Sequence, residues 1–239
     1  MRWLIVSIKL SLKQKQDLKI IGVAVLYYLA ARLGYFLEFQ NTTALPAWPP
    51  SGVAFALTIL FGRSVWPGIT IGSLIANIMA YWNNPEFGPQ VILGISSLIA
   101  LGNTIEALAG NYMVQFWIKD RFPFQHAKNA FRFLFVTRIM CVVGAGIGTG
   151  SLLLNKVITA DLFLQTSFTW WIGNVVGILL FTPFILALFK RIDVRLRTRK
   201  ILEVVLFCFT LASIYFVSQI EYLSVTMERA LPFLSVPFL

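Results

Sequence analysis

Residues 162–189 read LFLQTSFTWWIGNVVGILLFTPFILALF, and residues 190–200 directly after them read KRIDVRLRTRK. The first run contains no Lys, Arg, Asp or Glu. As a helix rising about 1.5 Å per residue, it is long enough to cross a hydrocarbon core of about 30 Å. The second run carries six basic residues and one acid, which is typical of a loop on the cytoplasmic side of a membrane.

The same alternation of apolar runs and basic stretches extends along the whole chain. Sixteen of the twenty Lys and Arg residues fall in residues 2–19, Arg63, residues 119–132 and residues 190–200. The stretches between them carry acids, namely Glu38, Glu86, Asp161, Glu221 and Glu228. Because basic loops stay on the cytoplasmic side, this pattern predicts a multi-pass inner-membrane protein with a cytoplasmic N-terminus.

We expect an all-α polytopic membrane protein, a bundle of about eight transmembrane helices. Residues 1–19 are expected to form a basic interfacial segment on the cytoplasmic face, and residues 20–239 an integral membrane domain. The close joint at Gly62-Arg63 predicts that the second and third helices form an antiparallel hairpin. The expected helices are residues 20–39, 48–62, 65–82, 91–117, 131–154, 162–189 and 201–219, with an eighth cut short at 231–239.

The composition excludes several other classes of protein. At 58% hydrophobic and 13% charged residues, the chain is far more apolar than a soluble domain, in which roughly 25% are charged. The net charge of +10 does not indicate nucleic-acid binding, because the basic residues are scattered over loops where anionic headgroups attract them. Cys141 and Cys208 lie in apolar runs without metal-ligand spacing, and His126 is interpreted as a solvated loop residue. We therefore expect no metal, no cofactor and no enzymatic activity.

Small residues recur four apart, which lets membrane helices approach closely. The pairs are Gly68 and Gly72, Gly144 and Gly148, Gly146 and Gly150, and Gly173 and Gly177.

The segment Trp48-Pro49-Pro50-Ser51-Gly52 predicts a rigid helix start at the outer interface, because proline is favoured in a first helical turn. Two adjacent prolines suggest a start set below the surface, with free N–H groups directed at a cavity. The alternative is a purely architectural role.

Polar residues inside the predicted spans are candidates for a functional site, because charge in a bilayer is costly. Glu106 is near the middle of its helix, with Asn103 one turn before it on the same face. A Glu106–Arg138 pair is compatible with two antiparallel helices, either as part of a site or as a structural lock. The candidate ligand site has Trp48, Trp170 and Trp171 as walls, Asn103, Glu106 and Asn174 as polar contacts, and Arg32 and Arg138 as counter-charges.

Together these motifs resemble the first class of membrane-associated sensor domains, the MASE type of bacterial integral-membrane input domains, over residues 20–239. In that family an acidic residue is common where this chain has Asn174. The matching segments are Trp48-Pro49-Pro50-Ser51-Gly52, Gly62-Arg63, Trp66-Pro67-Gly68, residues 72–77, Gly102-Asn103-Thr104-Ile105-Glu106-Ala107 and residues 171–183.

The resemblance implies a sensory input module that precedes a cytoplasmic histidine kinase or cyclic-di-GMP enzyme missing from this chain. Its partners would be the lipid bilayer, the output domain or a partner protein, and a small-molecule ligand, with a homodimer in the full-length context. The alternative function is a transporter-like binder of a small substrate, since midplane polar residues and broken helices also mark transporters. A kinase or cyclase domain encoded after residue 239 would favour sensing over transport.

Overall fold

The computed structural model describes residues 11–36, 47–120 and 123–189. In these residues the chain is helical and contains no strand. Among the described residues, four segments are long and apolar enough to cross a membrane, namely Leu12–Phe36, Pro89–Trp117, Ala127–Leu154 and Ala160–Phe189. The expected all-α architecture with apolar helices of membrane-spanning length is confirmed. The expected count of about eight helices is not confirmed, and the helices expected at 201–219 and 231–239 lie outside the described residues. The α-helices are α1 (Leu12–Phe36), α2 (Pro49–Phe61), α3 (Trp66–Tyr81), α4 (Pro89–Trp117), α5 (Ala127–Leu154) and α6 (Phe163–Phe189), with 3₁₀ turns η1 (Arg63–Val65), η2 (Pro123–Gln125) and η3 (Ala160–Leu162).

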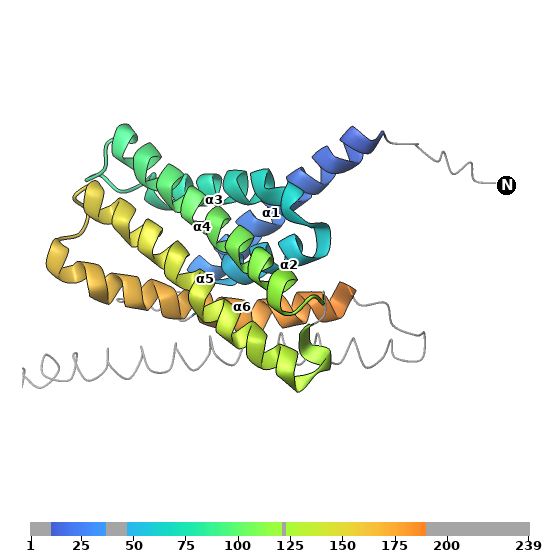
Figure 1. Cartoon of the computed structure of the whole chain (residues 1–239). Coiled ribbons are helices and arrows are strands. Elements are labelled where there is room, and N and C mark those ends of the chain that lie inside the picture. The colour runs from blue at the N-terminus through green and yellow to red at the C-terminus, as the bar shows by residue number, and fades with distance from the viewer. Residues whose placement is uncertain (1–10, 37–46, 121–122, 190–239) are drawn as a thin grey trace, which may run out of the picture.

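Helix α1 begins at Leu12 rather than near residue 20. The backbone N–H of Ser11 donates to Oε1 of Gln14 at 2.8 Å, and the backbone N–H of Gln14 donates to Oγ of Ser11 at 3.2 Å. This reciprocal pair is a capping box, which satisfies two backbone donors at a helix start. The first turns of α1 therefore project beyond the bundle (Figure 1).

The six described helices form a closed ring of contacts in the order α1, α3, α4, α5, α6 and α2, and α2 returns to α1 while also packing across the ring on α4. Eleven of the thirteen residues of α2 are buried, so this helix lies at the centre of the bundle (Figure 1). At about 1.5 Å per residue it is about 20 Å long, shorter than the hydrocarbon core. On its α5 side, the Phe55 ring stacks on Phe133 at 5.5 Å between centroids.

The expected antiparallel hairpin of the second and third helices is wrong. They are joined through Gly62 and η1, but α3 packs on α1 and α4, whereas α2 packs on α6, α1 and α4. Gly62 has a φ of 84°, which is open to glycine but unfavourable for other residues, and it redirects the chain away from α2. Gly68 and Gly72 then allow α3 to contact the backbone carbonyls of Ile20 and Ala24 in α1.

Seven of the ten described Lys and Arg residues lie at one end of the bundle, the basic end, whereas Arg32 and Arg138 lie within helices and Lys156 lies in the loop at the opposite end. The side-chain amide of Gln16 in α1 donates to the backbone carbonyl of Ser64 in η1 at 2.8 Å. At the same end, Arg132 of α5 donates to the backbone carbonyl of Trp117 in α4 at 2.7 Å. The acid-bearing loops 82–88 and 155–162 lie at the opposite end, as the alternating chain direction of the helices requires (Figure 1).

Candidate functional site

Glu106 lies where four helices meet and is only 1% exposed. Asn174 of α6 donates from Nδ2 to Oε2 of Glu106 at 2.8 Å. Ser51, in the first turn of α2, lies near this carboxyl group, although its Oγ makes no hydrogen bond within the described residues. Gly144 of α5 leaves the space that the carboxyl occupies, because a Cβ there would overlap Oε2. Glycine is therefore the residue of α5 that makes room for a buried acid.

A second group of hydrogen bonds begins one turn earlier on α4. Asn103 donates from Nδ2 to the hydroxyl of Tyr27 in α1 and to Oγ of Ser73 in α3, each at 2.9 Å. Asn77 donates to the same Ser73 Oγ at 3.3 Å. The side chain of Trp48 also approaches the Tyr27 hydroxyl. This group ties α1, α3 and α4 together beside the start of α2.

We call Tyr27, Ser51, Ser73, Asn103, Glu106 and Asn174 the polar core. Its six side chains come from α1, α2, α3, α4 and α6, and Gly144 of α5 makes room for it, so all six described helices converge there. Buried polar groups are costly unless they are hydrogen-bonded, and most of these groups are. Among the described residues, the side chains that interact with the Glu106 carboxyl include no Lys or Arg.

The polar core consists of hydrogen-bonding groups. Within the described part of the chain, no three His, Cys, Asp or Glu residues lie close enough together to hold a metal ion. Amides, hydroxyls and one carboxyl can exchange hydrogen-bond partners with one another or with a polar ligand. Such an exchange would alter how the helices pack, because the groups belong to five different helices.

The start of α2 is buried, as the double proline predicts, but it faces α6 directly. The backbone N–H of Trp48 donates to the carbonyl of Gly173 at 2.8 Å, and the N–H of Ser51 donates to the carbonyl of Trp48 at 3.3 Å. Gly52 and Gly177 bring the two backbones together, because a Cβ on either would overlap a carbonyl oxygen of the other helix. The two prolines themselves lack an N–H. The space in front of this helix start is thus occupied by the backbone of α6.

The two adjacent tryptophans of α6 point to different neighbours, and neither belongs to the polar core. Trp170 is half-buried, and its ring covers Gly148 of α5. The indole N–H of Trp171 donates to the backbone carbonyl of Arg138 at 2.9 Å, and its ring stacks on Phe168. Both rings thus pack α6 against α5.

Neither arginine of the predicted site reaches the polar core. The side chains of Arg32 and Arg138 are exposed, whereas Glu106 is buried and bonded to Asn174. The Glu106–Arg138 pair that the sequence suggested is therefore not formed. The reason is helical periodicity: Gly144 faces Glu106, and a residue six positions away is rotated by about 240° around the helix axis.

The sequence analysis missed Tyr27 and Ser73 as members of the site, and it named Ser51 only as part of the helix start at Trp48. Tyr27 carries the only polar group that α1 contributes to the polar core, and it is completely buried. Ser73 directly follows Gly72, on the face of α3 that packs closely on α1. The available signal in the sequence was that Ser73 is a polar residue next to a glycine at a helix contact. The partner of Ser73, however, depends on the order of the helices around the ring.

Comparison with known proteins yields one match. A family model described as MASE1 matches residues 21–239, which is nearly the whole chain and includes every residue of the polar core. MASE1 domains are membrane sensory input domains. No curated protein and no solved structure matches the chain.

Proposed function

This chain belongs to the MASE1 family, and we propose that it senses a ligand, a membrane state or a partner protein and relays it to a cytoplasmic output domain. That output domain would be a histidine kinase or a cyclic-di-GMP enzyme, joined beyond residue 239. The basic end of the bundle would face the cytoplasm of a bacterium, following the positive-inside bias. The full-length protein would act as a homodimer in the inner membrane.

The observation that carries this proposal is the convergence of all six described helices on the polar core around Glu106 and Asn174. An acid inside a membrane bundle marks a functional site by default, because its burial is costly. A stimulus that binds two packings of the bundle with different affinity shifts the population between them. Such a shift can break hydrogen bonds between helices and form others in their place.

Four of the predicted ligand-site residues lie at or beside the polar core, namely Trp48, Asn103, Glu106 and Asn174. We propose that these four respond to the stimulus, together with Tyr27. The other four predicted residues contact α5 or are exposed, so we assign them no sensing role.

The test is Glu106→Gln in the full-length protein, with Glu86→Gln as the matched control. Both changes replace a carboxylate by an amide of the same shape, but Glu86 is exposed in a loop remote from the polar core. We expect Glu106→Gln to change the basal or stimulated output of the kinase or cyclase by several-fold while the protein still folds in membranes. Unaltered output from Glu106→Gln, equal to that from Glu86→Gln, would reduce Glu106 to a packing residue.

A second candidate function is a transporter-like binder of a small substrate. The observation that favours it is α2, a helix of thirteen residues whose first turn is buried inside the bundle. Short helices that begin at the midplane are a feature of secondary transporters. Reading the coding sequence after residue 239 separates the two candidates, because an encoded kinase or cyclase domain supports sensing and a nearby stop codon supports transport.

A further inference from the structure

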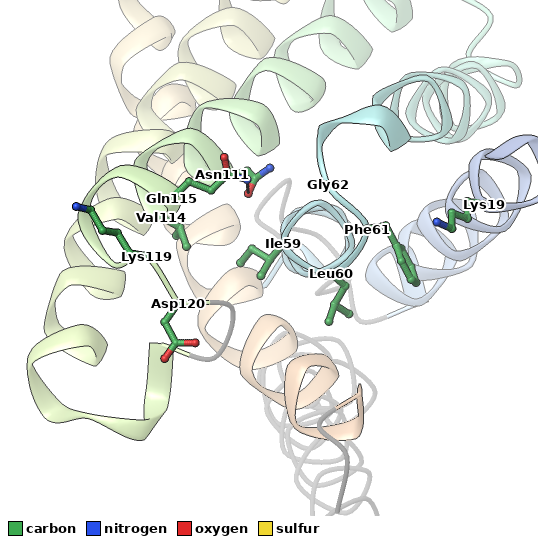
Figure 2. A pocket seen from close by; sticks show the side chains of 10 residues that line it. All are labelled: Lys19, Ile59, Leu60, Phe61, Gly62, Asn111, Val114, Gln115, Lys119 and Asp120. Atoms are coloured by element: carbon green, nitrogen blue, oxygen red, sulfur yellow. Dashed lines mark hydrogen bonds between the residues drawn. The ribbon is translucent and has the colours of Figure 1, made fainter. Parts of the chain in front are cut away.

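A cavity of about 590 Å³ opens at the basic end of the bundle, between α1, α2 and α4 (Figure 2). Its volume is in the range of small-molecule sites, roughly 300–1,000 Å³. The cavity is separate from the polar core, because its walls are the final turns of α2 and α4 together with Lys19 of α1. Leu60 and Phe61 give it an apolar side.

A buried amide without a partner lies in the wall of this cavity. Asn111 of α4 is 1% exposed, and its Oδ1 accepts a hydrogen bond from Nε2 of Gln115 at 3.2 Å. That bond fixes the orientation of the amide and leaves Nδ2 as the remaining donor. Within the described residues, Nδ2 of Asn111 has no hydrogen-bond partner. Buried donors are nearly always satisfied in native proteins, so this one indicates that an acceptor belongs here.

The charges around the cavity also favour an anion. Lys19 and Lys119 line it against one acid, Asp120, which leaves one excess positive charge. Nζ of Lys19 lies 5.8 Å from the centre of the Phe61 ring, so the ammonium group is placed on the α1 side of the cavity (Figure 2).

Lys119 lies at the other side, in an unusual backbone conformation. Its φ is 58°, and its N–H donates to the carbonyl of Val114 at 3.0 Å. This position after a helix end is usually glycine, because a residue with a side chain is strained there. Strained residues cluster at binding sites, and here the strained residue is a lysine that lines the cavity.

We propose that this cavity binds the phosphate group of an anionic ligand, either a phospholipid headgroup or a free phosphate compound. Amide and ammonium donors are the groups that hold phosphate oxygens. The apolar side at Leu60 and Phe61 and the location at the basic end fit a lipid whose acyl chain continues into the bilayer. Anionic headgroups are attracted to basic residues at that level of the membrane.

The experiment measures ligand binding to the full 239-residue chain by native mass spectrometry in detergent micelles. The probes are phosphatidylglycerol, glycerol 3-phosphate, and diacylglycerol, which has the same chains without the phosphate. We expect phosphatidylglycerol to bind and diacylglycerol not to bind. If phosphatidylglycerol binds and glycerol 3-phosphate does not, the ligand is a lipid; binding of glycerol 3-phosphate assigns a free phosphate compound.

Variants locate the binding in the cavity. Asn111→Asp replaces the free donor by an acceptor, and Lys19→Gln with Lys119→Gln removes both ammonium groups. We expect each to weaken binding by about tenfold, equivalent to about 1.4 kcal/mol. Lys13→Gln with Lys128→Gln is the control, because it removes the same charge from two lysines that do not line the cavity.

Three results would overturn the proposal. They are binding of neither phosphate probe, binding of diacylglycerol as strong as that of phosphatidylglycerol, and equal affinity in the cavity variants and the control. Because Lys19 and Lys119 are exposed, the lysine variant tests the site even if Asn111→Asp does not fold.

Discussion

Replacing Gly177 by alanine tests the contact that holds α2 inside the bundle. A Cβ at position 177 would overlap the carbonyl oxygen of Trp48 and lie 2.6 Å from its carbonyl carbon. These are backbone atoms, so they cannot rotate away as a flexible side chain would. The backbone N–H of Trp48 also donates a hydrogen bond to the carbonyl of Gly173 at 2.8 Å. Alanine at 177 therefore requires the whole start of α2 to shift.

The size of the effect follows from three terms. Overpacking a closely packed interface destabilises by about 1–3 kcal/mol. Loss of the Trp48–Gly173 hydrogen bond adds about 1 kcal/mol. Against these, alanine stabilises the interior of a helix by about 1 kcal/mol relative to glycine. We expect Gly177→Ala to lower the free energy of unfolding by about 1–3 kcal/mol in total.

The assay is equilibrium unfolding of the purified chain in mixed micelles, followed by far-ultraviolet circular dichroism. Gly146→Ala is the matched control, because an added Cβ on that α5 glycine meets no described atom within 4 Å. Only the helix-propensity term then remains, so the control is expected to be neutral or up to about 1 kcal/mol more stable. If Gly177→Ala is as stable as the natural chain, the backbone contact between α2 and α6 is not as close as described.

Three further predictions test other contacts. A double-mutant cycle of Tyr27→Phe and Asn103→Ala should give a coupling free energy of about 0.6 kcal/mol, the average for hydrogen bonds between membrane helices. A coupling of zero would show that the hydrogen bond between Asn103 and Tyr27 does not form. Ser11→Ala should destabilise the start of α1 by about 1 kcal/mol and speed hydrogen exchange in its first turn, whereas unchanged exchange would argue against the capping box. A cysteine at Glu86 should react with a membrane-impermeant maleimide in intact cells, and one at Arg63 only after lysis; the reverse pattern would invert the proposed topology.

Hydropathy and charge predicted the described helices well, because a membrane restricts backbone to helices in long apolar runs. The limits of α2 followed from local chemistry, with proline at its start and Gly62 after its end. The start of α1 was placed too late because the start of the apolar run marks only where the chain enters the membrane. The first residue of the helix is marked instead by the capping box at Ser11 and Gln14. The sequence contained both signals, and only the first was used.

The site was predicted in part, and the errors have two causes. Asn103, Glu106 and Asn174 were identified because polar residues in apolar spans are rare and need partners. The Glu106–Arg138 pair failed on helical periodicity, because α4 and α5 do pack together but Gly144, not Arg138, faces Glu106. The other partners depend on which helices are neighbours, and chain order suggested α2 beside α3. The ring instead places α3 against α1. Tyr27 and Ser73 consequently meet at Asn103, a contact that no local pattern encodes.

The central position of α2 links the polar core to the basic end of the bundle. Its first turn carries Ser51, which lies near Glu106, and is fixed to α6 through Gly177. Its last residue borders the cavity, next to Gly62. A helix moves as a nearly rigid rod because its backbone hydrogen bonds are internal. A rearrangement at Glu106 that displaces the start of α2 must therefore also displace its end, and the cavity at the basic end would change with it.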